Sequence, residues 1–140
     1  MTRILAVDLG EQRIGLALSD PTGNIAGGLR TIRRGLRDEE MAAINAVIAK
    51  EDVARVIVGM PLSMSGQPGV QAELTRRWVA VLQQSIAVPV EVLDERLTSV
   101  QAHRSLDSMG VKRRQHRQHV DEIAATLLLQ GYLDGQRKDQ

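Results

Sequence analysis

The acidic residues best suited to chemistry stand where apolar segments end. Asp8 closes the apolar run Ile4–Val7, and Asp94 and Glu95 follow the run Val88–Leu93. Burying chain up to an ionised carboxylate is costly unless the charge has a partner. A divalent cation is one such partner, because it reverses the repulsion that raises the pKa values of clustered acids. The question is whether the chain brings these acids together.

The apolar pattern predicts an α/β fold in which two of the later strands are reached through helices. We expect strands at residues 3–8, 13–19, 24–33, 54–60 and 88–93, and helices at 38–50 and 70–85. Tight turns around Gly10 and after Asp20 make the first three strands antiparallel neighbours. The last two strands should run parallel to the first. Asp20 itself is expected to be a turn residue beside Pro21.

The remainder of the chain is expected to be helical. Thr98 with Gln101 three residues later fits a capping box, and Gly110 is expected to end that helix. A final helix is predicted from core-facing spacing at Val120, Ile123, Ala124, Leu127 and Leu128. The helix at 70–85 shows the same kind of spacing at Leu74, Trp78, Val81 and Leu82.

The predicted topology brings three acids towards one edge of the sheet. Parallel strands deliver their C-terminal ends to the same edge, where open α/β sheets hold their sites. If the strand at 54–60 lies between the other two, Asp8 and Glu95 emerge about 10 Å apart. That gap has room for two metal ions about 3.5–4 Å apart. Asp121, at the border of the final helix's apolar stripe, suits a third ligand. The chain has no cysteine, and oxygen ligands favour Mg²⁺ or Mn²⁺.

Each acid also has a structural explanation of its own. Asp8 can be a turn residue, since Asp is common where strands end. Glu95 can pair with Arg96 at the surface. Asp121 can be a first-turn acid favoured by the helix dipole if the last helix begins near Arg117. Only convergence on one edge favours the metal site over these alternatives.

Composition excludes several classes of protein. The chain of 140 residues is expected to form a single domain, 1–140, with formal net charge +1 and no cysteine for thiol chemistry. No apolar run approaches the roughly 20 residues that span a bilayer, and no secretory signal is recognisable. We therefore expect a cytoplasmic protein without membrane contact. Basic clusters at 30–37 and 112–117 can bind a polyanion. With Trp78 and Tyr132 the only aromatic residues, nucleic acid would be contacted through phosphates rather than by base stacking.

Four stretches in order resemble the motifs of a known family over almost the whole chain. "DLGEQRIGLALSD", "VGMPLSMSGQPG", "DERLTSVQA" and "VDEIAATLLLQGYL" are similar to successive motifs of the YqgF family, RuvC-like members of the ribonuclease H superfamily. The resemblance implies a ribonuclease H-like fold, with a five-stranded mixed sheet in the order 3-2-1-4-5 flanked by helices. It also implies a nuclease site made by Asp8, Glu95 and Asp121. The family is described as a Holliday junction resolvase and is also assigned to 5′-end processing of the small-subunit rRNA precursor.

Two positions depart from the family pattern. The first motif often reads Lys-Arg where this chain has Gln12-Arg13, and the loop motif often has an acid where Ser65 precedes Gly66. Both departures concern phosphate contacts and leave the three acids in place.

The resulting hypothesis is a hydrolase, a Mg²⁺- or Mn²⁺-dependent endo- or exonuclease that matures the 5′ end of pre-16S rRNA. Asp8, Glu95 and Asp121 would hold the metal, and the expected phosphate contacts are Arg13, Arg96, Lys112 and Arg113. The expected partner is nucleic acid, structured precursor RNA before branched DNA, with the protein a monomer or a weak homodimer. One alternative is resolution of four-way DNA junctions, and another is a non-catalytic nucleic-acid-binding factor. A sugar-kinase or actin-like ATPase needs two lobes, and this chain is long enough for one.

Overall fold

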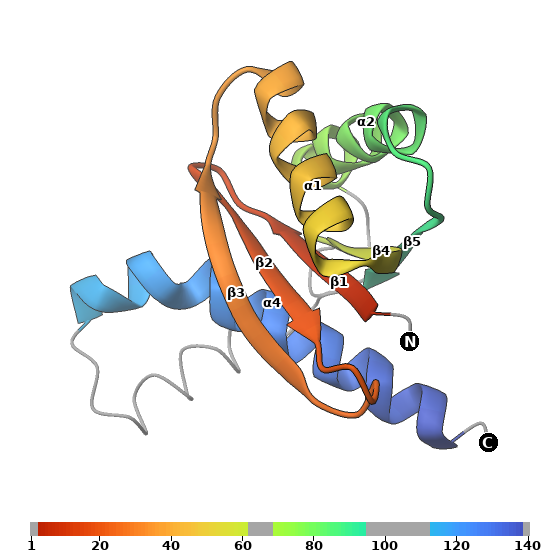
Figure 1. Ribbon diagram of the computed structural model, residues 1–140. Coiled ribbons are helices and arrows are strands. Elements are labelled where there is room, and N and C mark those ends of the chain that lie inside the picture. The colour runs from red at the N-terminus through yellow and green to blue at the C-terminus, as the bar shows by residue number, and fades with distance from the viewer. Residues whose placement is uncertain (1–2, 62–68, 95–112, 139–140) are drawn as a thin grey trace.

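One mixed five-stranded sheet organises the molecule, with helices on both faces (Figure 1). The computed structural model describes residues 3–61, 69–94 and 113–138, and within the last segment the side chains of residues 123–136. The strands are β1 (Arg3–Leu9), β2 (Arg13–Ser19), β3 (Ala26–Arg33), β4 (Val53–Met60) and β5 (Val90–Asp94). The helices are α1 (Arg37–Glu51), α2 (Val70–Ser85) and α4 (Arg113–Lys138). The helix predicted at 98–110 lies outside the described residues.

The strand order is β3-β2-β1-β4-β5, which confirms the ribonuclease H-like topology. β1 pairs antiparallel with β2, and β2 pairs antiparallel with β3. β4 runs parallel to both β1 and β5. The C-terminal ends of β1, β4 and β5 therefore lie at one edge of the sheet, as the sequence predicts.

The turn between β2 and β3 is built around Asp20. Its carboxylate accepts hydrogen bonds from the hydroxyl of Thr22 and, at 2.9 Å each, from the backbone N–H groups of Asn24 and Ile25. The Thr22 hydroxyl and the Ile25 N–H contribute most to lowering the pKa of Asp20 to about 2. Because these bonds hold Asn24 and Ile25 in the turn, β3 begins at Ala26 rather than at the predicted Asn24. Asp20 is confirmed as a turn residue far from Asp8.

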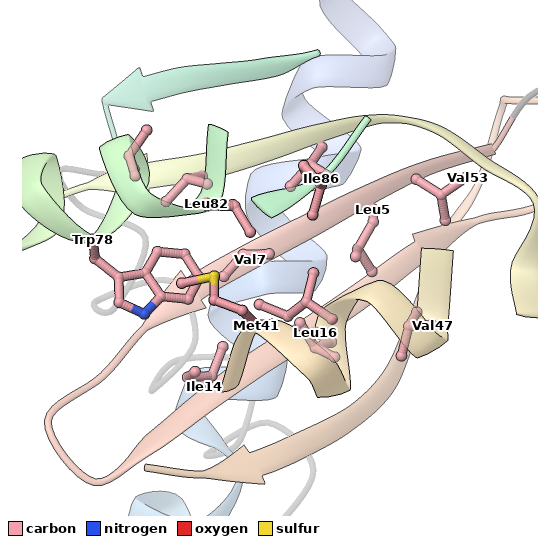
Figure 2. Packing of buried hydrophobic residues seen from close by; sticks show 14 residues of the cluster. Leu5, Val7, Ile14, Leu16, Met41, Val47, Val53, Trp78, Leu82 and Ile86 are labelled. Carbon is pink, nitrogen blue, oxygen red and sulfur yellow. The ribbon is translucent and has the colours of Figure 1, made fainter. Parts of the chain in front are cut away.

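The two faces of the sheet pack against different helices. Side chains alternate along β1, so Leu5 and Val7 join the core that α1 and α2 cover (Figure 2). Ala6 faces the other way and joins a second core with residues of α4 such as Leu129. The same alternation assigns Asp8 to the face that α4 covers. Within the described helices, no segment is both long and apolar enough to cross a membrane.

The buried face of α2 differs slightly from the predicted one. Trp78 and Leu82 are buried as expected, and Trp78 packs beside the α1 residue Met41 (Figure 2). Leu74 is 49% exposed, however, and Thr75 is buried instead. Leu74 and Thr75 both lie near the border of the apolar stripe of α2. Because a helical turn has 3.6 residues, the spacing of apolar residues does not decide which of two neighbours at that border faces the core. The prediction for Leu74 was wrong.

Helix α4 runs antiparallel to β1. Tyr132 accepts a 2.6 Å hydrogen bond from Arg55 near the start of β4. Gln130 accepts a 2.9 Å bond from the backbone N–H of Ala26 at the start of β3. The C-terminal part of α4 thus lies where β1, β3 and β4 begin, and its N-terminal part extends towards their far ends. α4 begins at Arg113, so Asp121 lies beyond its first turn, and the helix-dipole explanation for that acid does not apply.

Candidate functional site

Asp8 stands between two glycines on the face that α4 covers. It is 7% exposed and pairs with Gly15 of β2. Gly59 of β4 follows the paired residues Val7 and Val58 and so flanks Asp8 on the other side. Any larger residue at these positions would place a Cβ atom about 4.5–5.5 Å from that of Asp8. The sheet therefore leaves lateral space for a group bound to this carboxylate.

The structure places the remaining predicted acids only in part. Asp94 pairs with Met60 and ends β5 at the same sheet edge as Asp8, with β4 lying between β5 and β1. Glu95 follows it and lies outside the described residues. The backbone at Asp121 belongs to α4, but its side chain is not among those described. Within the described part of the chain no cluster of three or more metal-ligating side chains occurs, so the three-acid site stays a prediction.

The predicted phosphate contacts are distributed in the same way. Arg13 opens β2, two positions before Gly15, and so shares the face of Asp8. Arg113 is the first residue of α4, and its side chain is not described. Arg96 and Lys112 lie outside the described residues.

The turn that follows Asp8 is fixed by one arginine. The backbone N–H of Gly10 donates to the carbonyl of Arg13 at 2.9 Å, which closes the turn between β1 and β2. Arg34 donates through Nη1 to the carbonyl of Gly10 at 2.8 Å and through its backbone N–H to the carbonyl of Gln12 at 2.9 Å. Its Nε donates to Glu40 at 2.7 Å. The turn is thereby tied to helix α1.

Glu40 is a buried carboxylate at the centre of this arrangement. It is 2% exposed and also accepts hydrogen bonds from Nε1 of Trp78 at 3.0 Å and from the backbone N–H of Gly35 at 3.1 Å. Burial favours the neutral acid, but the bonds from Arg34, Trp78 and Gly35 outweigh it and lower the pKa of Glu40 below its ordinary value. Glu40 is therefore ionised in the folded protein and forms an ion pair with Arg34.

Sequence reasoning included Arg34 only in the basic cluster at 30–37 and missed its ion pair with Glu40, although a signal for Glu40 existed. Glu40 lies four residues before Ile44 and seven before Val47, which are both buried on α1. A charged residue in phase with a buried stripe requires a buried partner. No local pattern indicates that this partner is Arg34.

Solved structures with the same architecture include two junction resolvases. Thermus thermophilus RuvC in complex with a Holliday junction substrate gives a TM-score of 0.62 at 16% identity, covering 99% of this chain and 97% of that one. The fowlpox virus resolvase with its Holliday junction DNA gives 0.52 at 12% identity, covering 96% and 98%. The fold is therefore ribonuclease H-like, in the form found in RuvC-type resolvases.

Sequence comparison assigns the family. The family model described as "RuvX: Holliday junction resolvase" matches residues 2–135. A Chloroflexus aurantiacus protein named "Putative pre-16S rRNA nuclease" is 42% identical over 136 residues, or 97% of this chain and 89% of that protein. A Moorella thermoacetica protein of the same name is 45% identical over 132 residues, or 94% of each chain. The chain belongs to the RuvX family, also called YqgF, which confirms the resemblance seen in its motifs.

Replacing Glu40 by Gln is expected to lower the free energy of unfolding by about 2 kcal/mol at neutral pH, because it removes the charge that pairs with the half-buried Arg34. Chemical denaturation with urea measures the change. Glu39→Gln is the matched control, since Glu39 lies in the same helical turn and is exposed.

The pH dependence tests the ionised state of Glu40. A carboxyl with a lowered pKa in the folded state stabilises the protein above its unfolded-state pKa, and this contribution is lost as pH falls through the folded-state pKa. The stability gap between wild type and Glu40→Gln should therefore close in acid. An equal gap at neutral and acid pH would contradict the ion pair.

Proposed function

We propose that this protein is a metal-dependent nuclease that hydrolyses phosphodiester bonds during 5′-end maturation of pre-16S rRNA. The observation that carries the proposal is Asp8, a buried carboxylate at the C-terminal edge of the sheet with a glycine on each neighbouring strand. The names of the relatives from Chloroflexus and Moorella support the RNA substrate.

The direction of α4 supports Asp121 as a second acid of the site. Gln130 contacts Ala26 at the end of the sheet where Ile4 also lies. Asp121 precedes Gln130 by nine residues, an advance of about 13.5 Å along a helix. Asp8 follows Ile4 by four residues, an advance of about 13 Å along a strand. These similar advances along antiparallel elements support Asp121 as a ligand at the same edge of the sheet as Asp8.

The chemistry of the donors fits a hard cation. Asp8 offers carboxylate oxygens beside two glycines, and Glu95, next after the strand end at Asp94, would add another carboxylate. Oxygen ligands of this kind suit Mg²⁺ or Mn²⁺. Such an ion activates water and stabilises the charge on the leaving oxygen during phosphodiester hydrolysis.

The chain's own groups would bind and orient the substrate. Arg13 shares the face of Asp8 and would hold a phosphate next to it. The side chains of Arg96, Lys112 and Arg113 are proposed to continue this contact along the nucleic acid. Arg34 and Glu40 would act as positioning residues, because they fix the turn between Asp8 and Arg13.

Replacing Asp8 by Asn is expected to lower Mg²⁺-dependent cleavage of a pre-16S rRNA 5′-end fragment at least about 100-fold, since a neutral amide is a poor ligand and cannot balance developing charge. Gel analysis of end-labelled RNA measures the rate. Asp38→Asn, which removes an exposed carboxylate from α1, should cleave like wild type. Undiminished cleavage by Asp8→Asn would contradict the proposal.

Added Mg²⁺ is expected to raise the melting temperature of wild type but not that of Asp8→Asn. An ion that binds only the folded state stabilises it by about 2.7 kcal/mol at a concentration of 100 times its Kd. Without divalent cations, Asp8→Asn should melt no lower than wild type, because it relieves repulsion among the acids. Differential scanning calorimetry measures both effects. A large loss of melting temperature in the metal-free variant would make Asp8 a structural residue.

Junction resolution is the second candidate, because the matching family model carries that description and RuvC shares the fold. The direct test compares cleavage of a four-way DNA junction with cleavage of structured precursor RNA by the same preparation. Faster cleavage of the RNA is expected. Preferred cleavage of the junction would replace the RNA assignment, and binding of both without Mg²⁺-dependent cleavage would indicate a non-catalytic binding factor.

A further inference from the structure

A basic groove lies beside the turn that follows Asp8. It has a volume of about 700 Å³, and we call it the arginine groove. Its lining comes from the β1–β2 turn, the start of β2 and the end of β3: Glu11, Gln12, Arg13, Thr31, Arg33 and Arg34. Arg13 is an expected phosphate contact, and Arg33 and Arg34 belong to the basic cluster at 30–37 that can bind a polyanion.

The strand register brings the arginine groove onto the face of Asp8. Asp8 pairs with Gly15, and Gly15 pairs in turn with Thr31 of β3. Arg13 pairs with Arg33 two positions further along. Since side chains two apart share a face, Arg13, Thr31 and Arg33 all lie on the side of the sheet that carries Asp8.

This placement depends on one irregularity in β3. Leu16 pairs with Arg30, whereas Ala17 pairs with Gly28, so Leu29 is an extra residue at a β-bulge. The bulge shifts the alternation of β3 by one residue. Without it, Arg33 would project to the opposite face, where α1 packs.

The groove is close enough to Asp8 for one nucleic-acid strand to contact both. Arg33 is two strand spacings and two residues away from Asp8 in the sheet. With strands about 4.8 Å apart and a rise of about 3.3 Å per residue, the backbone separation is about 12 Å. A long arginine side chain shortens the remaining gap, so a strand held at Asp8 reaches the groove within a few nucleotides.

The charges of the groove favour a phosphate. The lining holds three arginines and one acid, Glu11. One of the arginines, Arg34, is paired with Glu40, and Glu11 accepts a hydrogen bond from Gln71 of α2 at 3.4 Å. Arg34 uses two of its donors on Gly10 and Glu40, which hold it in place. Arg33 is exposed, and no ion pair of Arg33 occurs within the segments that the structure describes. Its planar guanidinium suits the paired oxygens of a phosphodiester.

We propose that the arginine groove is a phosphate site that holds the nucleic-acid strand a few nucleotides from the cleaved bond, with Arg33 as its contact. The inference rests on the proposed function, because it takes the strand at Asp8 to be the substrate. Arg33 then sets how far the bound strand must extend beyond the cleavage site.

The test measures binding in EDTA, so that no cleavage intervenes. Fluorescence anisotropy of a labelled pre-16S rRNA 5′-end fragment gives the affinity at a series of KCl concentrations. For a single-stranded contact, Arg33→Gln should reduce the slope of log K against log[KCl] by about 0.7. Arg30→Gln is the matched control, because it removes the same charge from the same strand on the opposite face, where Arg30 lies beside α1. Its slope should match that of wild type.

The combined results of the binding and cleavage assays test the proposed phosphate site and the proposed nuclease activity separately. Equal slopes for Arg33→Gln and Arg30→Gln, with RNA still cleaved by wild type, would contradict the proposed phosphate site but not the proposed nuclease activity. A reduced slope for Arg33→Gln alone, with no cleavage of RNA or DNA by wild type, would support a phosphate contact in the groove but would overturn both the nuclease and the groove's assigned distance from a cleaved bond. Thermal melting of both variants at the wild-type temperature shows that the comparison concerns folded protein.

Discussion

The ion pair that buried Glu40 forms with half-buried Arg34 is the constraint on which the geometry around Asp8 depends. Apolar packing has no preferred direction, so the cores alone do not fix how the β1–β2 turn sits above the helices. Glu40 supplies that direction, because it binds Trp78 of α2 and, through Arg34, the backbone of Gly10. A carboxylate this deeply buried is stable only while its donors are in place. The helices and the turn are therefore positioned together.

The two faces of the sheet differ in the residues that they carry: one forms the larger apolar core, and the other carries Asp8. The side covered by α1 and α2 carries large residues such as Leu5 and Trp78. The side covered by α4 carries small residues on β1 and β2, including Ala6 and Ala17 and then glycine next to Asp8, beside the larger Ile57 of β4. Small residues let a helix approach a sheet closely, so α4 can pack close to β1 and β2. Asp8 thus lies on the face of the sheet that α4 covers.

Much of the fold follows from local sequence, and the site follows only in part. Strong apolar runs and turn residues define β2 (Arg13–Ser19) and α2 (Val70–Ser85) at the predicted bounds. A regular alternation of inward and outward side chains does not describe β3, because the bulge at Leu29 reverses that alternation halfway along the strand. Asp8 is predictable from a charge at the end of an apolar run. The Arg34–Glu40 pair is not, since its partners meet only after the sheet and α1 have packed.

The bulge in β3 also bears on how the molecule behaves at high concentration. β3 is one edge of the sheet, and an edge strand offers unpaired backbone groups to other chains. A bulge bends and twists a strand, and β3 follows a curved path along the sheet (Figure 1). Its arginines add like-charge repulsion between copies. The opposite edge, β5, is only 5 residues long. Neither edge is therefore a good template for a strand of another chain, which protects the protein from edge-to-edge aggregation.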